Sequence, residues 1–569
     1  MASSPGYPSM YDIGEGALIV AFGNRVSDAL RLRVANLHTA LREADLPGVF
    51  DVVPAYASVL VRFDPLRADI EQLRATILPL LHREDRASIP EPRHHTIPVR
   101  YGGEDGPDLA EVASLHGLTG AEVIRRHSDK LYTVYFLGFL PGFAYMGRVG
   151  RRIATPRLST PRVRVPPGSI GIAGAQTAIY PFNSPGGWRI IGRTSMRVWD
   201  PYAQQPALFA PGDTVHFVPS DSMSAPADPG PPSFEALNPI FKVLEPGALT
   251  TIQDLGRPDY GHIGLSTGGV SDIEAALRAN ALVGNRPGAA LLEITWSGPT
   301  LQAMRPATIA LEGTDFGCRV DGTLVPPGVG WFVRGGATIK FVQMSPSGGG
   351  ARAYVAVSGG FEAPTVLGSR STSLPARFGG FEGRALRSGD ILGVDVPPAA
   401  PAHLAGRYWI SRPDLALHGS TLLRFVRYKG VASITPSMFR QFVGQEWRVT
   451  SQSDRIGIRL EPNGEGGITA RTRESASLGV VRGAIQLPPG GNPVVLGADH
   501  QTTGGYPLLG VVAQADWPAL AQLQPGDHLR FMEISREEAV AALSASRNAL
   551  LDGLRKLKLG SRESDYALV

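Results

Sequence analysis

Short runs of alternating or continuous apolar residues dominate the first 90 positions and predict both strands and helices. The stretch SVLVRF at 58–63 alternates with period two, and ALIVAF at 17–22 is a short apolar run, so each predicts a strand. Apolar residues at helical spacing predict helices over 27–44 and around 66–83. Strands and helices that alternate in this way predict a small α+β domain at 1–92.

The stretch YTVYFLGFLPGFAYMG at 132–147 is almost entirely apolar but has Pro141 between Gly138 and Gly142. A membrane-spanning helix needs roughly 20 consecutive apolar residues, and such breakers would leave backbone groups unpaired in lipid. The β-branched and aromatic residues at 132–137 predict a strand instead, followed by a turn at 138–142.

Three later helices are predicted from their first turns. A hydroxyl residue followed three positions later by Glu is typical of a capping box. The pairs are Thr119 with Glu122, Ser271 with Glu274, and Ser535 with Glu538. The last pair predicts an amphipathic helix that opens a C-terminal segment at 536–569.

The chain repeats part of its pattern, which predicts related modules. APGDTVHF, LRSGDILGV and QPGDHLRF close three successive segments. The first and third segments also share Gly-small-Ile, then Gln-Thr, then Gly-Gly-aromatic. We therefore expect three mostly antiparallel β-barrel modules. The predicted ranges are 93–219, 237–396 and 397–535, with a Pro-rich linker at 220–236.

Composition narrows the classes of function. Basic residues number 55 and acidic residues 51, with no basic stripe, so nucleic-acid binding has little support. The single cysteine, Cys318, excludes an internal disulfide and a cysteine-cluster metal site. With no disulfide framework and no signal-peptide pattern at the N-terminus, we expect a cytoplasmic protein without membrane contact.

Two Gln-Thr pairs, Gln176-Thr177 and Gln501-Thr502, recur between apolar strands and glycines. Glutamine offers a donor and an acceptor and threonine a hydroxyl, which suits recognition of an amide or carboxylate. The same groups could instead satisfy buried strand ends. Asp499 and His500 precede the second pair and could serve as a base and an anion contact, or have a structural role.

Other charged residues lie at strand or helix ends. Asp272 begins a predicted helix, where it could act chemically or simply interact with the helix dipole. Asp454 and Arg455 precede a strand, and Arg193 follows two aliphatic residues at the end of another. Arg370 lies among three hydroxyl residues in LGSRSTSL, which is typical of an anion-binding loop. Surface ion pairs and turns are the alternatives.

Several nucleotide and metal motifs are missing. The sequence has no G-x-x-x-x-G-K-[ST] loop, no dinucleotide fingerprint and no H-E-x-x-H. An ATP site would therefore not be a P-loop, and the sequence identifies no metal ligands.

Two longer sets of motifs resemble known families. VVPAYASVLVRFDP, YTVYFLGFLPGFAYMGRV and PPGSIGIAGAQTAIYPFNSPGGWRIIGRT resemble the B subunit of 5-oxoprolinase, over roughly 10–220. VLEPGALTTIQDLGRPDYGHIGLSTGGVSD, VLGSRSTSL and ADHQTTGGYPLLG resemble the C subunit of the same enzyme, over roughly 240–535. The motifs occur in family order, so the chain is identified as a fusion of the B and C subunits.

The resemblance implies a fold and an activity. The fold would be mainly β, with a small α+β N-terminal domain and three cyclophilin-like β-barrel modules. The activity would be ATP-dependent opening of 5-oxo-L-proline, a small cyclic amide, to L-glutamate with Mg²⁺ and a separate A subunit. The sequence is also compatible with a homo-oligomer.

The same fused arrangement is similar to the carboxyltransferase domain of urea carboxylase, which would require biotin on a partner. A third alternative is a non-enzymatic inhibitor of a histidine kinase, as one relative in the B family is. The attached C part argues against that role, because inhibition would not need two further barrels.

We expect the site residues to fall into three groups. The base or metal-binding candidates are Asp272, Asp454 and Asp499. The candidates for contact with the amide are Phe139, Pro141, Gly142, Phe143, Gln176, Thr177, Tyr180, Gln501, Thr502 and Tyr506. The candidate anion or phosphate contacts are Arg193, Arg370 and Arg455. Two departures from the family pattern, STGGVSD at 266–272 and Ala57, weaken the transfer of substrate preference and of one anion contact.

Overall fold

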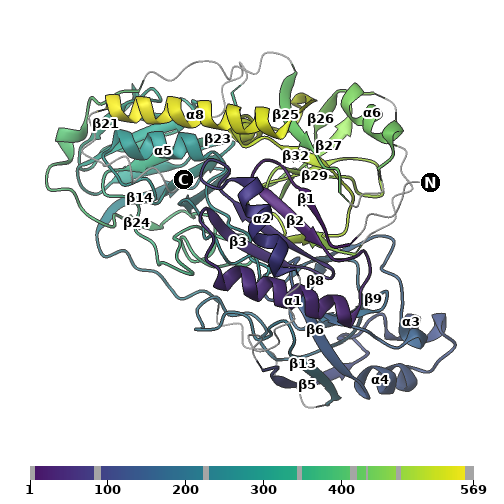
Figure 1. Cartoon of the computed structure of the whole chain (residues 1–569). Helices are drawn as coiled ribbons and strands as arrows, with labels where there is room; N and C mark the ends of the chain where they lie inside the picture. The colour runs from purple at the N-terminus through teal and green to yellow at the C-terminus, as the bar shows by residue number, and fades with distance from the viewer. Residues whose placement is uncertain are drawn as a thin grey trace.

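The computed structural model describes residues 7–81, 91–221, 230–342, 349–409, 420–430, 434–464, 466–468 and 476–557. Residues 222–229 of the predicted linker and 558–569 of the C-terminal segment lie outside these ranges. Figure 1 shows a small N-terminal α+β domain in front of three β-rich modules. The expected fold class, mainly β with a small α+β N-terminal domain, is confirmed.

The N-terminal domain is a four-stranded antiparallel sheet with two helices on one face. The sheet order is β1-β2-β4-β3. Its elements are β1 (Ser9–Asp12), β2 (Ala17–Ala21), α1 (Asp28–Glu43), β3 (Val49–Pro54), β4 (Ser58–Phe63) and α2 (Ile70–Leu80). Ser27 and Asp69 cap the two helices, whose starts therefore follow from local hydrogen bonds.

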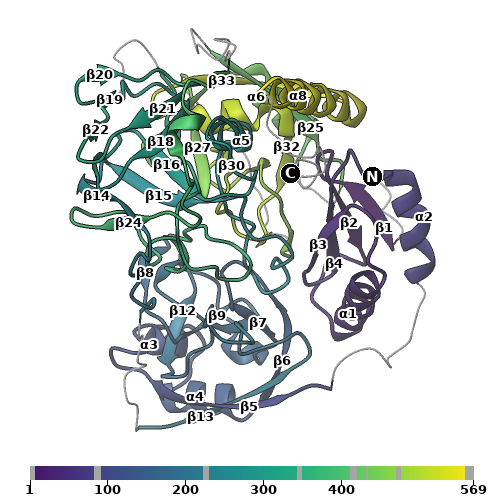
Figure 2. The same cartoon turned by 90° about the vertical axis from the view of Figure 1, so that its left-hand side faces the viewer.

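Both faces of this sheet are buried, which explains the continuous apolar run in β2. Leu18 and Val20 pack with the helices, whereas Ile19 lies in a second cluster with Val480 and Val511. Successive strand residues point to opposite faces, so an uninterrupted apolar strand needs a partner on each side. The second partner is the last β module, more than 400 residues along the chain, as Figure 2 shows.

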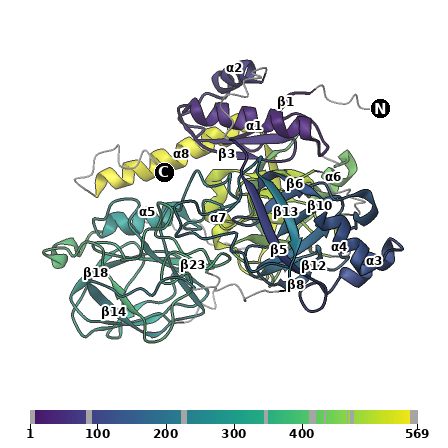
Figure 3. The ribbon, with the colours of Figure 1, turned by 90° about the horizontal axis from the view of Figure 1, so that it is seen from below.

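The first β module is a closed seven-stranded barrel, here called the first barrel. Its ring runs β10-β7-β6-β13-β5-β12-β9. The barrel strands are β5 (His94–Tyr101), β6 (Leu131–Leu137), β7 (Ala144–Gly147), β9 (Ser169–Ala173), β10 (Gln176–Ile179), β12 (Arg189–Arg193) and β13 (Thr214–Pro219). The module also contains α3 (Leu109–Leu115), α4 (Gly120–Ser128), β8 (Arg162–Val165) and β11 (Ser184–Gly186). Figure 3 shows β5 and β13, the first and last strands, side by side, and they pair in parallel.

The middle module has two sheets instead of one closed ring. The six-stranded sheet runs β20-β19-β22-β17-β14-β24 and the five-stranded sheet β15-β16-β23-β18-β21. The strands are β14 (Pro239–Glu245), β15 (Leu249–Gln253), β16 (Leu291–Thr295), β17 (Thr300–Ala303), β18 (Ala307–Gly313), β19 (Arg319–Val320), β20 (Thr323–Leu324), β21 (Gly330–Val333), β22 (Thr338–Lys340), β23 (Arg352–Val357) and β24 (Ile391–Gly393). One core lies between the sheets and contains the buried Cys318. The helix α5 (Ile273–Leu282) packs on β18 and β23.

The last barrel again closes seven strands, in the order β25-β32-β29-β30-β27-β26-β33. These strands are β25 (Thr421–Arg427), β26 (Trp447–Val449), β27 (Gly457–Pro462), β29 (Ala484–Gln486), β30 (Val494–Leu496), β32 (Leu508–Val512) and β33 (His528–Ile534). The other elements are α6 (Pro436–Gly444), β28 (Leu478–Gly479), β31 (Thr503–Gly504), α7 (Trp517–Gln522) and α8 (Arg536–Lys556). The long helix α8 crosses from β25 to α5 and so contacts both modules of the C part (Figure 1).

Two of the three predicted capping boxes are confirmed, at Thr119–Glu122 before α4 and at Ser535–Glu538 before α8. The third is wrong by one residue, because the N-cap of α5 is Asp272 and not Ser271. Within the described ranges, no helix combines the length and apolar character that a membrane span requires.

Candidate functional site

Loops from the three β modules and one strand residue of the N-terminal domain meet at one place, here called the junction. It consists of the β6–β7 loop (138–143), the segment between β15 and α5 (254–272), the segment between β30 and β32 (497–507), and Arg62 of the N-terminal sheet. The Phe139 N–H donates to Thr503 Oγ1 at 3.2 Å, and the Gly142 N–H donates to the Ile263 carbonyl at 2.9 Å. Arg62 Nη1 donates to Thr267 Oγ1 at 3.0 Å. Both resembled families therefore contribute to one contact region.

The β6–β7 loop is held in an uncommon backbone conformation. Phe139 has φ of 66°, in the left-handed region that a bulky residue rarely adopts. Such conformations persist where surrounding contacts enforce them, and they cluster at functional sites. A Cβ at Gly138 would lie 2.2 Å from Thr503 Oγ1. The first and last barrels therefore approach each other so closely here that only glycine fits.

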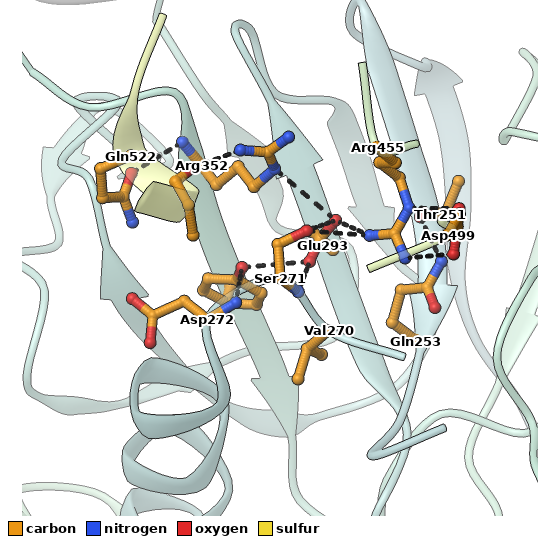
Figure 4. A network of polar contacts seen from close by, with 12 residues as sticks. Thr251, Gln253, Val270, Ser271, Asp272, Glu293, Arg352, Arg455, Asp499 and Gln522 are labelled. Carbon is orange, nitrogen blue, oxygen red and sulfur yellow. Dashed lines mark hydrogen bonds and ion pairs between the residues drawn. The ribbon is translucent and has the colours of Figure 1, made fainter. Parts of the chain in front are cut away.

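A buried ion network joins the middle module to the last barrel, with Arg455 at its centre (Figure 4). The Nε and Nη2 of Arg455 donate to the two Asp499 carboxylate oxygens at 2.8 and 3.0 Å. Its Nη1 pairs with Glu293 on β16 and donates to Ser271 Oγ at 3.1 Å. Its Nη2 also donates to the Gly269 carbonyl at 2.6 Å, so every nitrogen of the guanidinium has a partner.

The charged groups of this network shift one another's pKa values. Burial alone would lower the pKa of Arg455, but Asp499 and Glu293 raise it above its usual value. Burial would raise the pKa of Glu293, yet Arg455 and Arg352 hold it below its ordinary value. These shifts favour the charged forms of Arg455 and Glu293, and the paired N–H donors of Arg455 fix the Asp499 side chain at the junction.

The neighbouring helix explains why one sequence prediction was wrong. Ser271 does not cap α5, because its backbone N–H and hydroxyl both donate to Glu293, at 2.6 and 3.2 Å. Asp272 takes the capping position and accepts from the Ala275 N–H at 3.0 Å. Figure 4 shows its carboxylate pointing away from Arg455. The structure thus gives Asp272, a predicted catalytic residue, a helix-capping role.

Several buried polar atoms at the junction and on the strands that lead into it have no hydrogen-bond partner among the described residues. They are Gln253 Oε1, Arg257 Nε, Gln486 Nε2 and Thr502 Oγ1. An unsatisfied buried polar group costs about 1–3 kcal/mol, so such groups call for an explanation such as a ligand or water. Together they offer two acceptors and three donors, since a hydroxyl can act as either. A small polar molecule with an amide could satisfy them.

Gln501 and His500 lie beside these atoms. Gln501 Nε2 donates to Gln486 Oε1 at 2.9 Å, so the predicted Gln501-Thr502 pair does lie at the junction. His500 Nδ1 lies 2.6 Å from the Gln501 carbonyl, which favours the tautomer with the proton on Nδ1. Burial, with Arg62 nearby, lowers the pKa of His500 to about 3, so the imidazole is neutral at physiological pH.

The first Gln-Thr pair lies elsewhere. Thr177 is inside the first barrel, where its Oγ1 lies 3.0 Å from His127 Nε2. His127 in turn contacts the Tyr101 hydroxyl at 2.8 Å. Gln176 is half-buried at the start of β10, which pairs with β7 and β9. Thr177 is therefore part of a satisfied barrel interior.

The expected aromatic wall of the first barrel is present in part. Phe143 contacts Tyr180 edge-on with ring centroids 5.2 Å apart, and Phe139 contacts Phe143 at 5.5 Å. Tyr56 of the N-terminal domain joins the same aromatic cluster. Pro141 and Gly142 are buried in the loop itself, so the structure brings the loop and Tyr180 together and leaves Thr177 out.

The hydroxyl-rich loop at 367–374 does bind an anion, but the anion is a side chain of this protein. Ser369 Oγ and Ser371 Oγ donate to one Asp254 oxygen at 2.5 and 2.6 Å, and the Arg370 N–H donates to the other at 2.6 Å. The Arg370 guanidinium pairs with Asp395 at 2.7 Å. This loop holds the segment between β15 and α5 in place.

Two of the remaining candidates, Asp454 and Arg193, lie outside the junction, whereas Tyr506 lies within it. Asp454 is an exposed turn residue that accepts from the N–H groups of Ile456 and Gly457. Arg193 donates to the Pro167 carbonyl at 2.8 Å and lines a separate cavity. Tyr506 is half-buried in the segment between β30 and β32. Asp454 and Arg193 were predicted for the site because the direction of a loop cannot be deduced from the sequence alone.

Four polar residues at or beside the junction were missed in the sequence: Gln253, Arg257, Glu293 and Gln486. Gln253, Glu293 and Gln486 lie within strands, as in LLEIT and GAIQL, whereas Arg257 lies in the loop that follows β15. A charged or amide side chain within such a strand is rarely fully buried unless it is paired, which is a signal that could have found the three strand residues. Among the described residues, no group of three or more His, Cys, Asp and Glu side chains is arranged to hold a metal ion.

Comparison with known proteins agrees with this division of the chain. Residues 8–209 match the family described as carboxyltransferase domain, subdomain C and D, and residues 263–533 match subdomain A and B. The B subunit of 5-oxoprolinase from Escherichia coli O157:H7 is 42% identical over 37% of this chain and 94% of its own length. The C subunit of 5-oxoprolinase from Escherichia coli K12 is 36% identical over 53% of this chain and 94% of its own length.

A solved structure has both parts in one chain. The crystal structure of TTHA0988 is 37% identical, with a TM-score of 0.79 over 91% of this chain and 99% of that chain. Urea amidolyase of Lachancea kluyveri is 29% identical over 58% of this chain but only 19% of its own length. The chain belongs to the carboxyltransferase-domain family that includes the B and C subunits of 5-oxoprolinase, and it joins a B-like part and a C-like part in one polypeptide.

Proposed function

We propose that this protein is the fused B–C component of an ATP-dependent 5-oxoprolinase. It would open 5-oxo-L-proline to L-glutamate together with a separate A subunit. The relatives that match each part nearly end to end are named as subunits of that enzyme, which supports both the activity and the need for a partner.

One observation carries the proposal. The Phe139 N–H of the B-like part donates to Thr503 Oγ1 of the C-like part, in a region with buried polar atoms that have no partner among the described residues. Two subunits that were only structural neighbours would have no need for this close fit of glycine and strained loop. A shared site for one small amide explains both features.

The residues at the junction suit a lactam. Gln253 Oε1 can accept from the lactam N–H, and Gln486 Nε2 or Thr502 Oγ1 can donate to its carbonyl oxygen. Arg257 is buried and has a free Nε, so it can bind the substrate carboxylate. Each of these contacts would hold the ring in one orientation.

Proton transfer would be the task of His500. Its imidazole is neutral, and with the proton on Nδ1 its Nε2 can accept a proton from an attacking water. Asp499, fixed by Arg455, would orient groups nearby and not itself take the proton.

ATP, when bound, supplies the phosphoryl group that turns an unreactive amide oxygen into a leaving group. The described residues contain no carboxylate cluster for a resident metal ion, so Mg²⁺ would arrive on the nucleotide phosphates. Arginine side chains, not a P-loop, would have to bind those phosphates.

The test is ATP hydrolysis by the purified chain with Mg²⁺ and 5-oxo-L-proline, with and without an added A subunit. We expect phosphate and glutamate to be released together, only in the presence of both 5-oxoproline and the A subunit. If the complete mixture shows no amide-dependent release, the proposal is contradicted.

A second candidate, carboxyl transfer in a urea-carboxylase-like system, rests on the match to carboxyltransferase-domain families and on the similarity to urea amidolyase. It would require a biotinylated partner. Carboxylation of urea from carboxybiotin, with no turnover of 5-oxoproline, would favour it.

A further inference from the structure

A cavity of about 480 Å³ lies between the first barrel and the middle module. Its lining comes from residues 167–202 of the barrel and 376–387 of the middle module, with Gly230 and Pro231 at one side. This volume is within the range of small-molecule sites, roughly 300–1,000 Å³. Like the junction, the cavity needs both parts of the chain to form.

Arginine dominates the lining. The arginines are Arg193, Arg197, Arg377, Arg384 and Arg387, whereas Glu382 is the one carboxylate among the described residues that line the cavity. Arg384 is neutralised by Glu382 and Asp390, and Arg197 pairs with Asp200 at 3.1 Å. A cation ligand is therefore excluded on charge.

Two of these arginines have free guanidinium groups. Neither Arg377 nor Arg387 makes a side-chain hydrogen bond or ion pair within the described parts of the chain, and both are exposed. Arg377 has φ of 57°, an uncommon backbone conformation that persists only where surrounding contacts enforce it. Guanidinium groups bind carboxylate and phosphate through paired N–H donors.

Aromatic residues form the rest of the lining. Phe182, Trp199 and Tyr202 line the cavity. The Trp199 indole N–H is buried and has no acceptor among the described residues. A buried donor without a partner is costly, so an acceptor supplied by a ligand or a bound water would remove the cost. Flat apolar rings beside free arginines suit a ligand with a planar ring and a chain of anionic groups.

The cavity lies directly behind the junction. Trp199 packs against Gly142 of the β6–β7 loop and against Phe378, with ring centroids 6.2 Å apart. The Arg257 guanidinium lies over the Phe378 ring, 4.8 Å from its centroid. Phe378 thus contacts both Trp199 of the cavity and Arg257 of the junction.

We propose that this cavity binds the phosphate chain of a nucleoside triphosphate, with Arg377 and Arg387 as its principal contacts. The identity of the ligand as a nucleotide rests on the proposed function. That the ligand is an anion rests on the residues that line the cavity. A single inorganic phosphate would leave most of the volume empty, whereas a nucleotide fills a site of this size and uses the aromatic lining.

The test is isothermal titration of the full chain with pyrophosphate and with ATP. We expect the double variant Arg377→Gln, Arg387→Gln to raise Kd about 100-fold for both, roughly tenfold for each lost charged hydrogen bond. Arg305→Gln removes an exposed arginine elsewhere on the middle module and should leave Kd unchanged. Added salt should weaken wild-type binding, and 5-oxoproline should not compete with pyrophosphate.

Unchanged Kd in the double variant, or no binding of either compound to wild type, would overturn the proposal. Because both arginines are exposed, the double variant should keep the wild-type melting temperature. Turnover of 5-oxoproline with an unaltered KM for ATP in the double variant would reject the cavity and leave the proposed function standing. Arginine-dependent pyrophosphate binding without turnover of 5-oxoproline would support the cavity as an anion site and contradict the proposed function.

Discussion

The first and last barrels close seven strands in the same ring order, but their loops do different things. Counting from the parallel pair of first and last strands, β5, β12, β9, β10, β7, β6 and β13 correspond to β25, β32, β29, β30, β27, β26 and β33. In both barrels the connection between the sixth and fifth of these strands reaches the junction. It carries Phe139 in the first barrel and Arg455 in the last.

The two Gln-Thr pairs do not occupy corresponding places in this frame. Gln176-Thr177 opens β10, whereas Gln501-Thr502 lies in the long connection between β30 and β32. Thr177 is satisfied by His127 inside its barrel, while Thr502 Oγ1 has no partner among the described residues. The repeat thus preserves the barrel frame, and of the two Gln-Thr pairs it is the one in the last barrel that lies at the junction.

Lowering the pH should have the largest effect on stability, because buried histidines lie in both barrels. Burial lowers the pKa of four histidines, to about 3 for His38, His127 and His500 and about 4 for His262. Their contribution to stability is complete above pH 6.5 and is lost as pH falls toward 3–4, because only the unfolded chain takes up these protons.

Thermal unfolding followed between pH 7 and 5 checks this. His127→Gln in the first barrel and His500→Gln at the junction should each reduce the pH slope of the unfolding free energy by up to about 1.4 kcal/mol per pH unit. The exposed His403→Gln is the control. A slope that neither variant alters would be inconsistent with buried neutral imidazoles.

Removing the guanidinium at the centre of the ion network should have the second-largest effect on stability. Arg455→Met leaves Asp499 without its ion-pair partner, and Glu293 keeps only the longer pair with Arg352 at 3.9 Å among the described residues, so we expect a loss of about 3–5 kcal/mol in urea denaturation. Arg448→Met, which breaks an exposed pair with Glu461 on the same barrel, should cost at most about 1 kcal/mol. Equal losses in the two variants would show that the network contributes little.

Gly138→Ala should disrupt the direct contact between the first and last barrels. Its Cβ would overlap Thr503 Oγ1, and such overpacking typically costs about 1–3 kcal/mol. Gly150→Ala in the same barrel meets open space and should be neutral. Combining Gly138→Ala with Thr503→Ala should recover part of the loss, and strict additivity in this double-mutant cycle would argue against direct contact.

The two threonines offer a matched comparison. Thr177→Val leaves the buried His127 with one partner fewer and should cost about 1–2 kcal/mol without changing the KM for 5-oxoproline. Thr502→Val removes a hydroxyl that has no partner in the described structure, so stability should change by less than about 0.5 kcal/mol while KM rises. The opposite ranking in melting temperature and KM would reverse our assignment.

The smallest effect is expected at Asp454. Because this carboxylate only accepts from N–H groups in an exposed turn, Asp454→Asn should leave kcat unchanged and shift stability by at most about 0.5 kcal/mol. A tenfold loss of kcat would return Asp454 to the list of catalytic residues.

Local signals were enough to predict much of the fold. Capping residues predicted the starts of α4 and α8, a continuous apolar run predicted β2, and the period of apolar residues predicted β4 and α1. The site could be predicted less well from the sequence, because it depends on partners that are far apart in the chain. Arg455 and Glu293 are 162 positions apart, and Asp254 is held by a loop 116 positions later.

The same distance explains the wrong cap of α5. Ser271 has the residue type of an N-cap, but Glu293 from a neighbouring strand takes both its N–H and its hydroxyl. A local rule cannot include a competitor that only the tertiary fold brings near.

The most direct test of a single shared site compares wild type and Gly138→Ala in 5-oxoproline-dependent ATP hydrolysis with the A subunit present. We predict that wild type releases phosphate and glutamate in equal amounts. Gly138→Ala should lose more than about tenfold in rate while remaining folded, because a misplacement of about 1 Å can cost this much. Wild-type turnover by Gly138→Ala would contradict the claim that the two parts build one site.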